Sequence, residues 1–169
     1  MLKNLILALA IVLAVFSAAF AADDVIEFEA KDLDGNVISS KELFKANKIT
    51  MVNVWGLWCP YCVQETGDLA ELHKKFQAKG CGIIGIEYEA KYDANTLNSA
   101  RKFLQAEGVT YPNVLMPQGV KVFEDVMGYP TSFFVDSNGK VLGEPIVGAQ
   151  VDQYEPTLDA LLANLKEKE

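Results

Sequence analysis

A Cys-X-X-Cys motif, Cys59-Pro60-Tyr61-Cys62, constrains this 169-residue chain more strongly than its composition does, because of what lies on either side of it. Residues 49–55 are rich in β-branched and apolar side chains, which is typical of a strand buried on both faces of a sheet. Residues 60–78 carry apolar side chains at helical spacing, and Gly80 follows as a helix stop. The motif is therefore predicted to lie between a central strand and the helix that follows it.

This position predicts an activated cysteine. Free backbone N–H groups and the helix dipole stabilise an anion at a helix N-terminus, so they lower the pKa of a thiol there. Pro60 would occupy the first helical position, which proline prefers. We predict that Cys59 is the nucleophile, that Cys62 is the resolving thiol, and that the two form a redox-active disulfide. Attack on a disulfide, a mixed-disulfide intermediate and its resolution need no metal and no organic cofactor.

The rest of the chain alternates predicted strands and helices. A strand over 81–88 and a helix over 97–106 indicate βαβ units and a parallel core sheet. We predict an α/β fold with a central mixed sheet flanked by helices, an N-terminal β-hairpin, and a helical insert over 93–108 after the second core strand. The other expected elements are a first hairpin with strands at 25–28 and 37–38, a strand at 114–115, a second hairpin over 132–147, and helices at 41–46, 120–126 and 152–165.

The N-terminal segment has the three zones of a secretory signal peptide: Lys3, an uncharged apolar run, and small residues up to Ala21. We expect cleavage after Ala21, which leaves a signal peptide over 1–21 and one domain over 22–169. The expected location is periplasmic or otherwise extracytoplasmic. The alternative is an uncleaved membrane anchor, since the uncharged stretch 4–22 is nearly long enough to span a bilayer.

The charge balance argues against two classes of partner. The formal net charge is −8 and the chain has no basic run, so it is poorly suited to bind nucleic acid or an anionic membrane surface. Nothing in the composition indicates the oligomeric state.

Several segments resemble one family of redox proteins. The motif with its preceding tryptophan, Trp58-Cys59-Pro60-Tyr61-Cys62, is similar to the active site of thioredoxin-fold proteins, and its surroundings are similar to the exported TlpA/ResA-like thiol-disulfide oxidoreductases. That branch includes thiol reductases of cytochrome c maturation. The resemblance implies a thioredoxin-like fold over 22–169 and protein disulfide or dithiol substrates. A reductant in an oxidising export compartment would also need electrons from a membrane donor. It is carried by Asp32-Leu33-Asp34-Gly35, Val52-Asn53-Val54-Trp55, Cys62-Val63-Gln64-Glu65 and residues 128–136.

The resemblance also implies roles for residues outside the cysteine pair. Pro130 falls at the position of the family's cis-proline, so Tyr129 and Pro130 are expected to dock a substrate strand, together with Trp58, Pro60 and Tyr61. Glu65 matches a glutamate one helical turn after the second cysteine. A carboxylate there could accept a proton from Cys62 during resolution, and the alternative is a charge that merely complements the helix N-terminus.

Two positions separate the chain from related groups. Asn53 stands where cytoplasmic thioredoxins carry a buried aspartate, which leaves Glu65 as the nearest candidate base. Thr66-Gly67 stands where the family usually has a helix-kinking proline. The dipeptide Pro60-Tyr61 is the one that glutaredoxins carry, but residues 131–134 lead directly into a strand, so we do not predict glutathione binding.

The same residues could carry other chemistries. A zinc site built from Cys59, Cys62, Cys81 and His73 would make the chain a non-catalytic metal-binding module. A peroxidase of this fold would carry Thr or Ser where Gly56 stands. Cys81 is expected to be an inert core thiol. We predict a reductase of protein disulfides, with an oxidase or isomerase of the same fold as the alternative.

Overall fold

The computed structural model describes residues 25–89 and 93–166. The predicted signal segment, 1–21, lies outside the described residues. A mixed sheet forms the centre of the molecule, as predicted, and it has five strands in the order β5-β4-β3-β6-β7. Strands β3, β4 and β5 are parallel, and β6 and β7 are antiparallel to their neighbours. The strands are β3 Ile49–Trp55, β4 Cys81–Glu87, β5 Asn113–Leu115, β6 Thr131–Asp136 and β7 Ile146–Val147.

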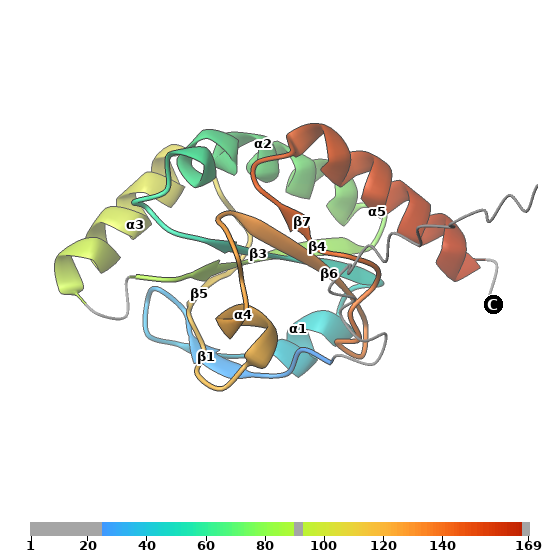
Figure 1. The fold of residues 1–169 in the computed structure, drawn as a ribbon, viewed down its shortest axis with the longest axis horizontal. Coiled ribbons are helices and arrows are strands. Elements are labelled where there is room, and N and C mark those ends of the chain that lie inside the picture. The colour runs from blue at the N-terminus through green and yellow to red at the C-terminus, as the bar shows by residue number, and fades with distance from the viewer. Residues whose placement is uncertain (1–24, 90–92, 167–169) are drawn as a thin grey trace, which may run out of the picture.

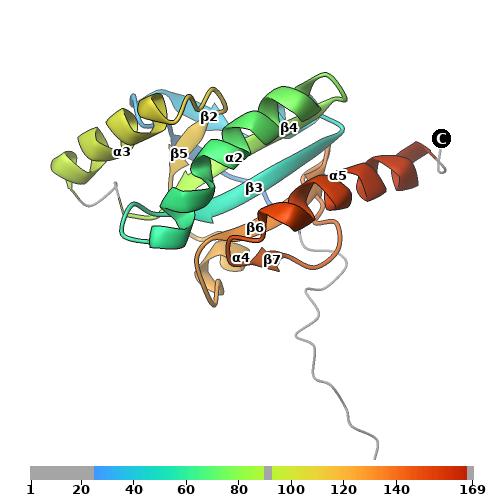
Figure 2. The same cartoon turned by 90° about the horizontal axis from the view of Figure 1, so that it is seen from above.

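Helices cover both faces of this sheet (Figure 1). One face carries the long helices α2 (Pro60–Gln77), α3 (Ala94–Ala106) and α5 (Val151–Lys166), and α2 lies between the other two (Figure 2). The opposite face carries the short elements: α1 Ser40–Lys45, α4 Lys121–Glu124, and the hairpin of β1 Glu29–Lys31 and β2 Val37–Ser39. The sheet is therefore the middle layer of three.

The alternation of side chains along β3 divides the core. Ile49 and Met51 pack with residues of α2 and α5, whereas Val52 and Val54 pack with the hairpin, α1 and α4. Successive side chains of a strand point to opposite faces, so Asn53 shares the α2 and α5 face with Ile49 and Met51. A polar side chain thus enters the apolar layer beneath the helix that carries the cysteine motif.

Several predicted element boundaries differ from the structure, and in the second hairpin the second strand is only Ile146–Val147. The first hairpin strand begins at Glu29, and Val25 forms only an isolated bridge with Lys140. Helix α3 begins at Ala94, one turn before the predicted start, because the Asp93 side chain caps it by accepting hydrogen bonds from the backbone N–H groups of residues 95 and 96. The apolar periodicity on which the prediction rested does not include this polar first turn.

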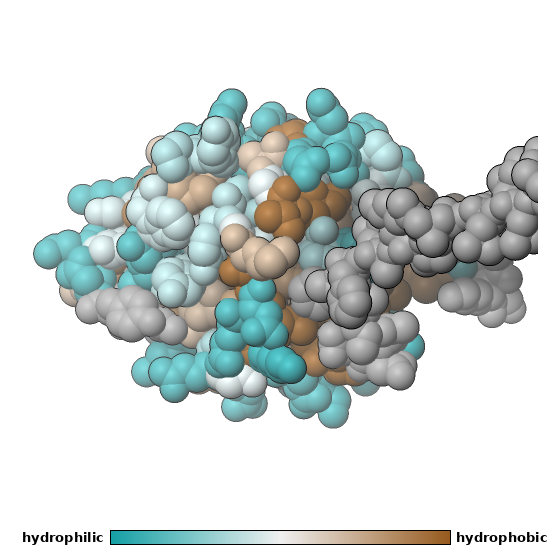
Figure 3. Space-filling view, in the orientation of Figure 1, coloured by the Kyte–Doolittle hydropathy of each residue, from teal (hydrophilic) through white to brown (hydrophobic). Residues whose placement is uncertain are grey.

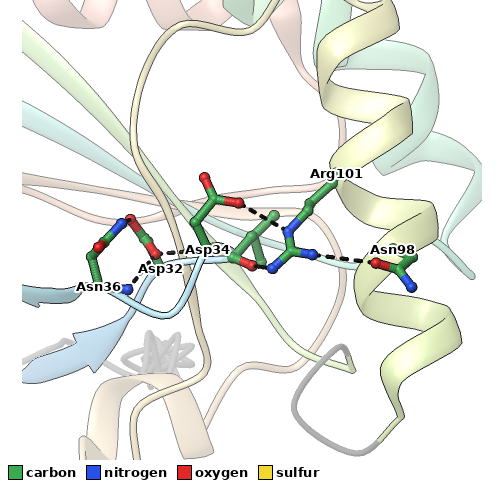
Figure 4. A network of polar contacts seen from close by, with 6 residues as sticks. Asp32, Asp34, Asn36, Asn98 and Arg101 are labelled. Atoms are coloured by element: carbon green, nitrogen blue, oxygen red, sulfur yellow. Dashed lines mark hydrogen bonds and ion pairs between the residues drawn. The ribbon is translucent and has the colours of Figure 1, made fainter.

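A polar network fastens the turn of the N-terminal hairpin to α3 (Figure 4). Within the turn, the Asp32 carboxylate accepts hydrogen bonds from the backbone N–H groups of Asp34 and Asn36, at 2.9 and 2.8 Å. Across to α3, the Arg101 guanidinium pairs with the Asp34 carboxylate at 3.0 Å and donates to the Leu33 carbonyl. Leu33 and Leu104 of α3 belong to the same apolar cluster as the motif cysteines, so this network holds the hairpin turn and α3 beside that cluster.

In the part of the chain that the structure describes, none of the helices combines the length and apolar character needed to cross a bilayer.

Candidate active site

The cysteine pair lies at the N-terminus of α2, as the sequence predicts. Cys59 is the N-cap residue and Pro60 the first helical residue. The Cys59 sulfur accepts a hydrogen bond from the backbone N–H of Cys62 at 3.2 Å. The two cysteines form a disulfide, with their Cα atoms 5.3 Å apart. A sulfur in this position receives both the helix dipole and a direct donor, which favours its thiolate when the bond is reduced.

Exposed aromatic side chains surround this buried pair. Trp58 is half exposed and Tyr61 is 65 % exposed, whereas Cys59 is only 3 % exposed. The ring of Tyr129 lies edge-on to that of Trp58, with 5.3 Å between the ring centroids, and the same distance separates it from the ring of Tyr88. Large, semi-rigid aromatic side chains of this kind are common where a protein surface docks a partner.

The loop before β6 borders the same surface. The Tyr129–Pro130 peptide bond is cis, as the resemblance implies, and the Pro130 carbonyl accepts a hydrogen bond from the Gly148 backbone N–H at 2.7 Å. Val147 of β7 pairs with Thr131 and is exposed. Figure 3 shows a hydrophobic patch over β7 near the centre of the face in view. The substrate-docking role of Tyr129 and Pro130 stays a prediction.

Glu65 is buried one turn below Cys62. Its side chain is 1 % exposed and accepts two hydrogen bonds, one from the Asn53 amide at 2.9 Å and one from the Tyr154 hydroxyl at 2.7 Å. The Asn53 amide also donates to the Ser132 hydroxyl at 3.0 Å. A carboxylate that only complements a helix N-terminus does not require this burial or these two hydrogen-bond donors. The role of Glu65 as proton acceptor stays a prediction.

Burial gives this carboxyl an unusual pKa. Desolvation raises the pKa of Glu65 from 4.5 to about 7, against the opposing effect of the hydrogen bonds from Tyr154 and Asn53, and the nearby Asp68 charge raises it further. A group with this pKa changes protonation state near neutral pH. It is therefore matched to accepting and returning a proton during thiol chemistry.

Three elements bring the Glu65 partners together. Asn53 of β3 and Ser132 of β6 are register partners in the sheet, and Tyr154 comes from α5. Tyr154 falls within the predicted helix 152–165, but the sequence did not predict its contact with Glu65, nor a role for Ser132. The one available signal is that a buried tyrosine hydroxyl usually finds a hydrogen-bond partner.

The residues of the alternative zinc site are not brought together. Cys81 is a free, buried thiol that pairs with Ile49 in the sheet register, at the opposite end of the strands from the motif. Burial raises the pKa of Cys81 to about 11, which keeps it protonated and unreactive, as expected for a core thiol. His73 is buried against the Tyr111 ring, and desolvation lowers its pKa. Across residues 25–89 and 93–166, no three His, Cys, Asp or Glu side chains gather as metal ligands.

Comparison with known proteins agrees with this site. Residues 21–143 match the AhpC/TSA family, a span that contains both cysteines and Pro130. The chain is 33 % identical over 128 residues to "Thiol-disulfide oxidoreductase ResA" of Bacillus thuringiensis, covering 75 % of this chain and 69 % of that protein. It is 29 % identical over 147 residues to the protein of the same name from Bacillus subtilis, covering 82 % and 78 %.

A solved structure is similar over most of its length. It is described as a putative thiol:disulfide interchange protein DsbE from Chlorobium tepidum, and it superposes with a TM-score of 0.68 at 28 % identity. The match covers 83 % of this chain and 96 % of that one. The names of the relatives and of the solved structure agree with thiol-disulfide chemistry at the Cys59–Cys62 pair. The chain belongs to the AhpC/TSA family, as a thiol-disulfide oxidoreductase of the thioredoxin fold.

Proposed function

We propose that this chain is an exported reductase of protein disulfides. In the reduced protein, the Cys59 thiolate attacks a substrate disulfide and forms a mixed disulfide. Cys62 then attacks the Cys59 sulfur, which releases the substrate as a dithiol and leaves the Cys59–Cys62 disulfide. A protein substrate would dock on the exposed side chains of Trp58 and Tyr61 and on the partly buried Tyr129, whose ring packs against that of Trp58.

The observation that carries the direction of electron flow is the buried carboxyl of Glu65 one turn below Cys62. When ionised, this group disfavours a second anion nearby, which opposes thiolate formation in the pair. An imidazolium would act in the opposite sense, but the chain has one histidine, His73, and burial lowers its pKa so that it is neutral at pH 7. A less stabilised thiolate makes the disulfide form more stable, and the dithiol form a better reductant.

The reduction potential tests this direction. We expect a potential below roughly −200 mV, nearer to the thioredoxin end of the scale than to the strongly oxidising DsbA end. Equilibration of the purified protein with glutathione buffers, followed by alkylation and mass measurement, gives this value. A potential near about −120 mV would assign the chain to the oxidases instead.

Export is part of the proposal and has its own test. The oxidising space outside the cytoplasm would keep a reductase oxidised, so the chain would need continuous electrons from a membrane donor. We expect protein recovered from the extracytoplasmic fraction to begin at Ala22. Recovery of the intact segment from Met1 in membrane extracts would favour the anchored alternative.

A further inference from the structure

We propose that Tyr154 is a positioning residue for Glu65, an inference that rests on the proposed role of Glu65 in resolving the mixed disulfide. The hydroxyl of Tyr154, carried by α5, holds one carboxylate oxygen of Glu65 in place beneath Cys62. The C-terminal helix thereby takes part in the redox chemistry of the N-terminus of α2.

The arrangement of the layers brings these two side chains together. Helices α2 and α5 lie side by side on one face of the sheet (Figure 2). Tyr154 is fully buried between α5 and the sheet, and its hydroxyl lies 2.7 Å from Glu65 Oε2. The hydroxyl also lies 3.3 Å from the Gly148 carbonyl. A phenol has one proton to donate, and the shorter contact to the stronger acceptor shows that it goes to the carboxylate.

The surrounding groups make this donor important for the charge on Glu65. Burial opposes ionisation of Glu65, and so does the charge of Asp68 on the same helix. Two donors favour ionisation: the hydroxyl of Tyr154 and the amide of Asn53, which reaches the other carboxylate oxygen. Burial and the Glu65 charge raise the pKa of Tyr154, so its hydroxyl keeps its proton. Tyr111 is also buried and interacts electrostatically with Glu65.

The resolving step shows why ionisation of Glu65 matters. The Cys62 thiol transfers its proton to the Glu65 carboxylate and becomes a thiolate. This thiolate attacks Cys59, the Cys59–Cys62 bond forms, and the bond between Cys59 and the substrate sulfur breaks, with its electron pair leaving on the substrate sulfur. A protonated Glu65 cannot accept the proton, so the rate of this step should rise with pH around the pKa of the carboxyl.

Replacing Tyr154 by phenylalanine removes the hydroxyl and keeps the ring. We expect Tyr154→Phe to raise the pKa of Glu65 by about one pH unit, because a hydrogen bond to the ionised form is lost. Carbon NMR of labelled glutamate in the disulfide form measures this pKa without any need for activity. The matched control is Tyr111→Phe, which removes the hydroxyl of a second buried tyrosine near Glu65. An unchanged Glu65 pKa in Tyr154→Phe, or an equal shift in the control, would overturn the inference.

The kinetic readout uses the reduced protein and one equivalent of dithiobis(nitrobenzoate). Release of the second nitrobenzoate thiol reports attack of Cys62 on the mixed disulfide at Cys59. We expect the pH profile of this release to move upward by about one unit in Tyr154→Phe, which slows it about tenfold at pH values below both midpoints. In a Glu65→Gln background, Tyr154→Phe should have no further effect on the profile.

The two readouts separate the inference from the proposed function. A shift of the Glu65 pKa without any shift of the rate profile would support the contact but remove Tyr154 and Glu65 from the resolving step. An oxidising reduction potential of the wild type would reject the proposed reductase function. The Glu65 pKa and the pH profile of nitrobenzoate release would still test the role of Tyr154. If Tyr154→Phe fails to fold, 3-fluorotyrosine at position 154 supplies a stronger donor and should lower the Glu65 pKa, and no change there would overturn the inference.

Discussion

Cys59→Ser is expected to reduce insulin disulfides no faster than the uncatalysed exchange. The serine hydroxyl stays protonated at neutral pH, so the helix N-terminus has no thiolate to stabilise, and no mixed disulfide can form at this position. In the reduced wild type, Cys59 should also be alkylated before Cys62, because Cys59 is the N-cap residue and its sulfur receives the Cys62 backbone N–H. Insulin turbidity and timed alkylation with peptide mass analysis measure the two effects.

Two further variants make this result specific. Cys81→Ala removes the free buried thiol at the far end of the strands and should leave insulin reduction unchanged. Cys62→Ser keeps the nucleophile but not the resolving thiol, so it should hold protein substrates covalently on Cys59. Faster alkylation of Cys62 than of Cys59 would reverse the assignment of the two thiols.

The placement of the motif could be predicted because it depends on local sequence. One continuous segment contains the apolar run of β3, the proline after Cys59 and the helically spaced apolar residues of α2. The disulfide needs only the geometry of one helical turn. The cis Tyr129–Pro130 bond was reached by a different route, since only the resemblance to a family, and no local pattern, indicated it.

The setting of Glu65 could not be predicted in the same way. Its carboxylate contacts Tyr154, which is 89 residues away in the sequence, and Asn53, which is 12 residues away. Both contacts depend on how α2 and α5 pack over β3. The helical pattern would place Tyr154 at the same position whether its hydroxyl bonded a carboxylate or a backbone carbonyl, so the pattern does not reveal the partner. The family resemblance therefore identified Glu65 as a candidate, but nothing in the sequence identified the partners that control its charge.

The burial of Glu65 predicts a large dependence of stability on pH. Its pKa is about 7 in the folded protein and 4.5 when the chain is unfolded and the group is in water. A raised carboxyl pKa means that the unfolded state loses its proton first, so the free energy of unfolding falls as pH rises from 4.5 and levels off above 7. The difference between the two pKa values corresponds to about 3 kcal/mol.

Glu65→Gln should remove this dependence. A glutamine has no charge to bury, its oxygen can accept the Asn53 hydrogen bond, and its amide can donate to the Tyr154 oxygen. We expect the free energy of unfolding of the variant, relative to wild type, to rise by about 3 kcal/mol between about pH 4 and pH 8. Urea unfolding of the two disulfide-bonded proteins measures it, and the titration of His73 cancels in the comparison.

Parallel curves for the two proteins would mean that the Glu65 carboxyl has a similar pKa in the folded and unfolded states, and that its burial has no electrostatic cost. Diverging curves would show that the wild type gives up stability at neutral pH by keeping an ionisable group where a glutamine fits. A carboxyl retained only for packing has no reason to carry that cost, since the amide forms the same contacts. A carboxyl needed to take a proton from Cys62 has a reason to carry the cost, because an amide cannot accept that proton.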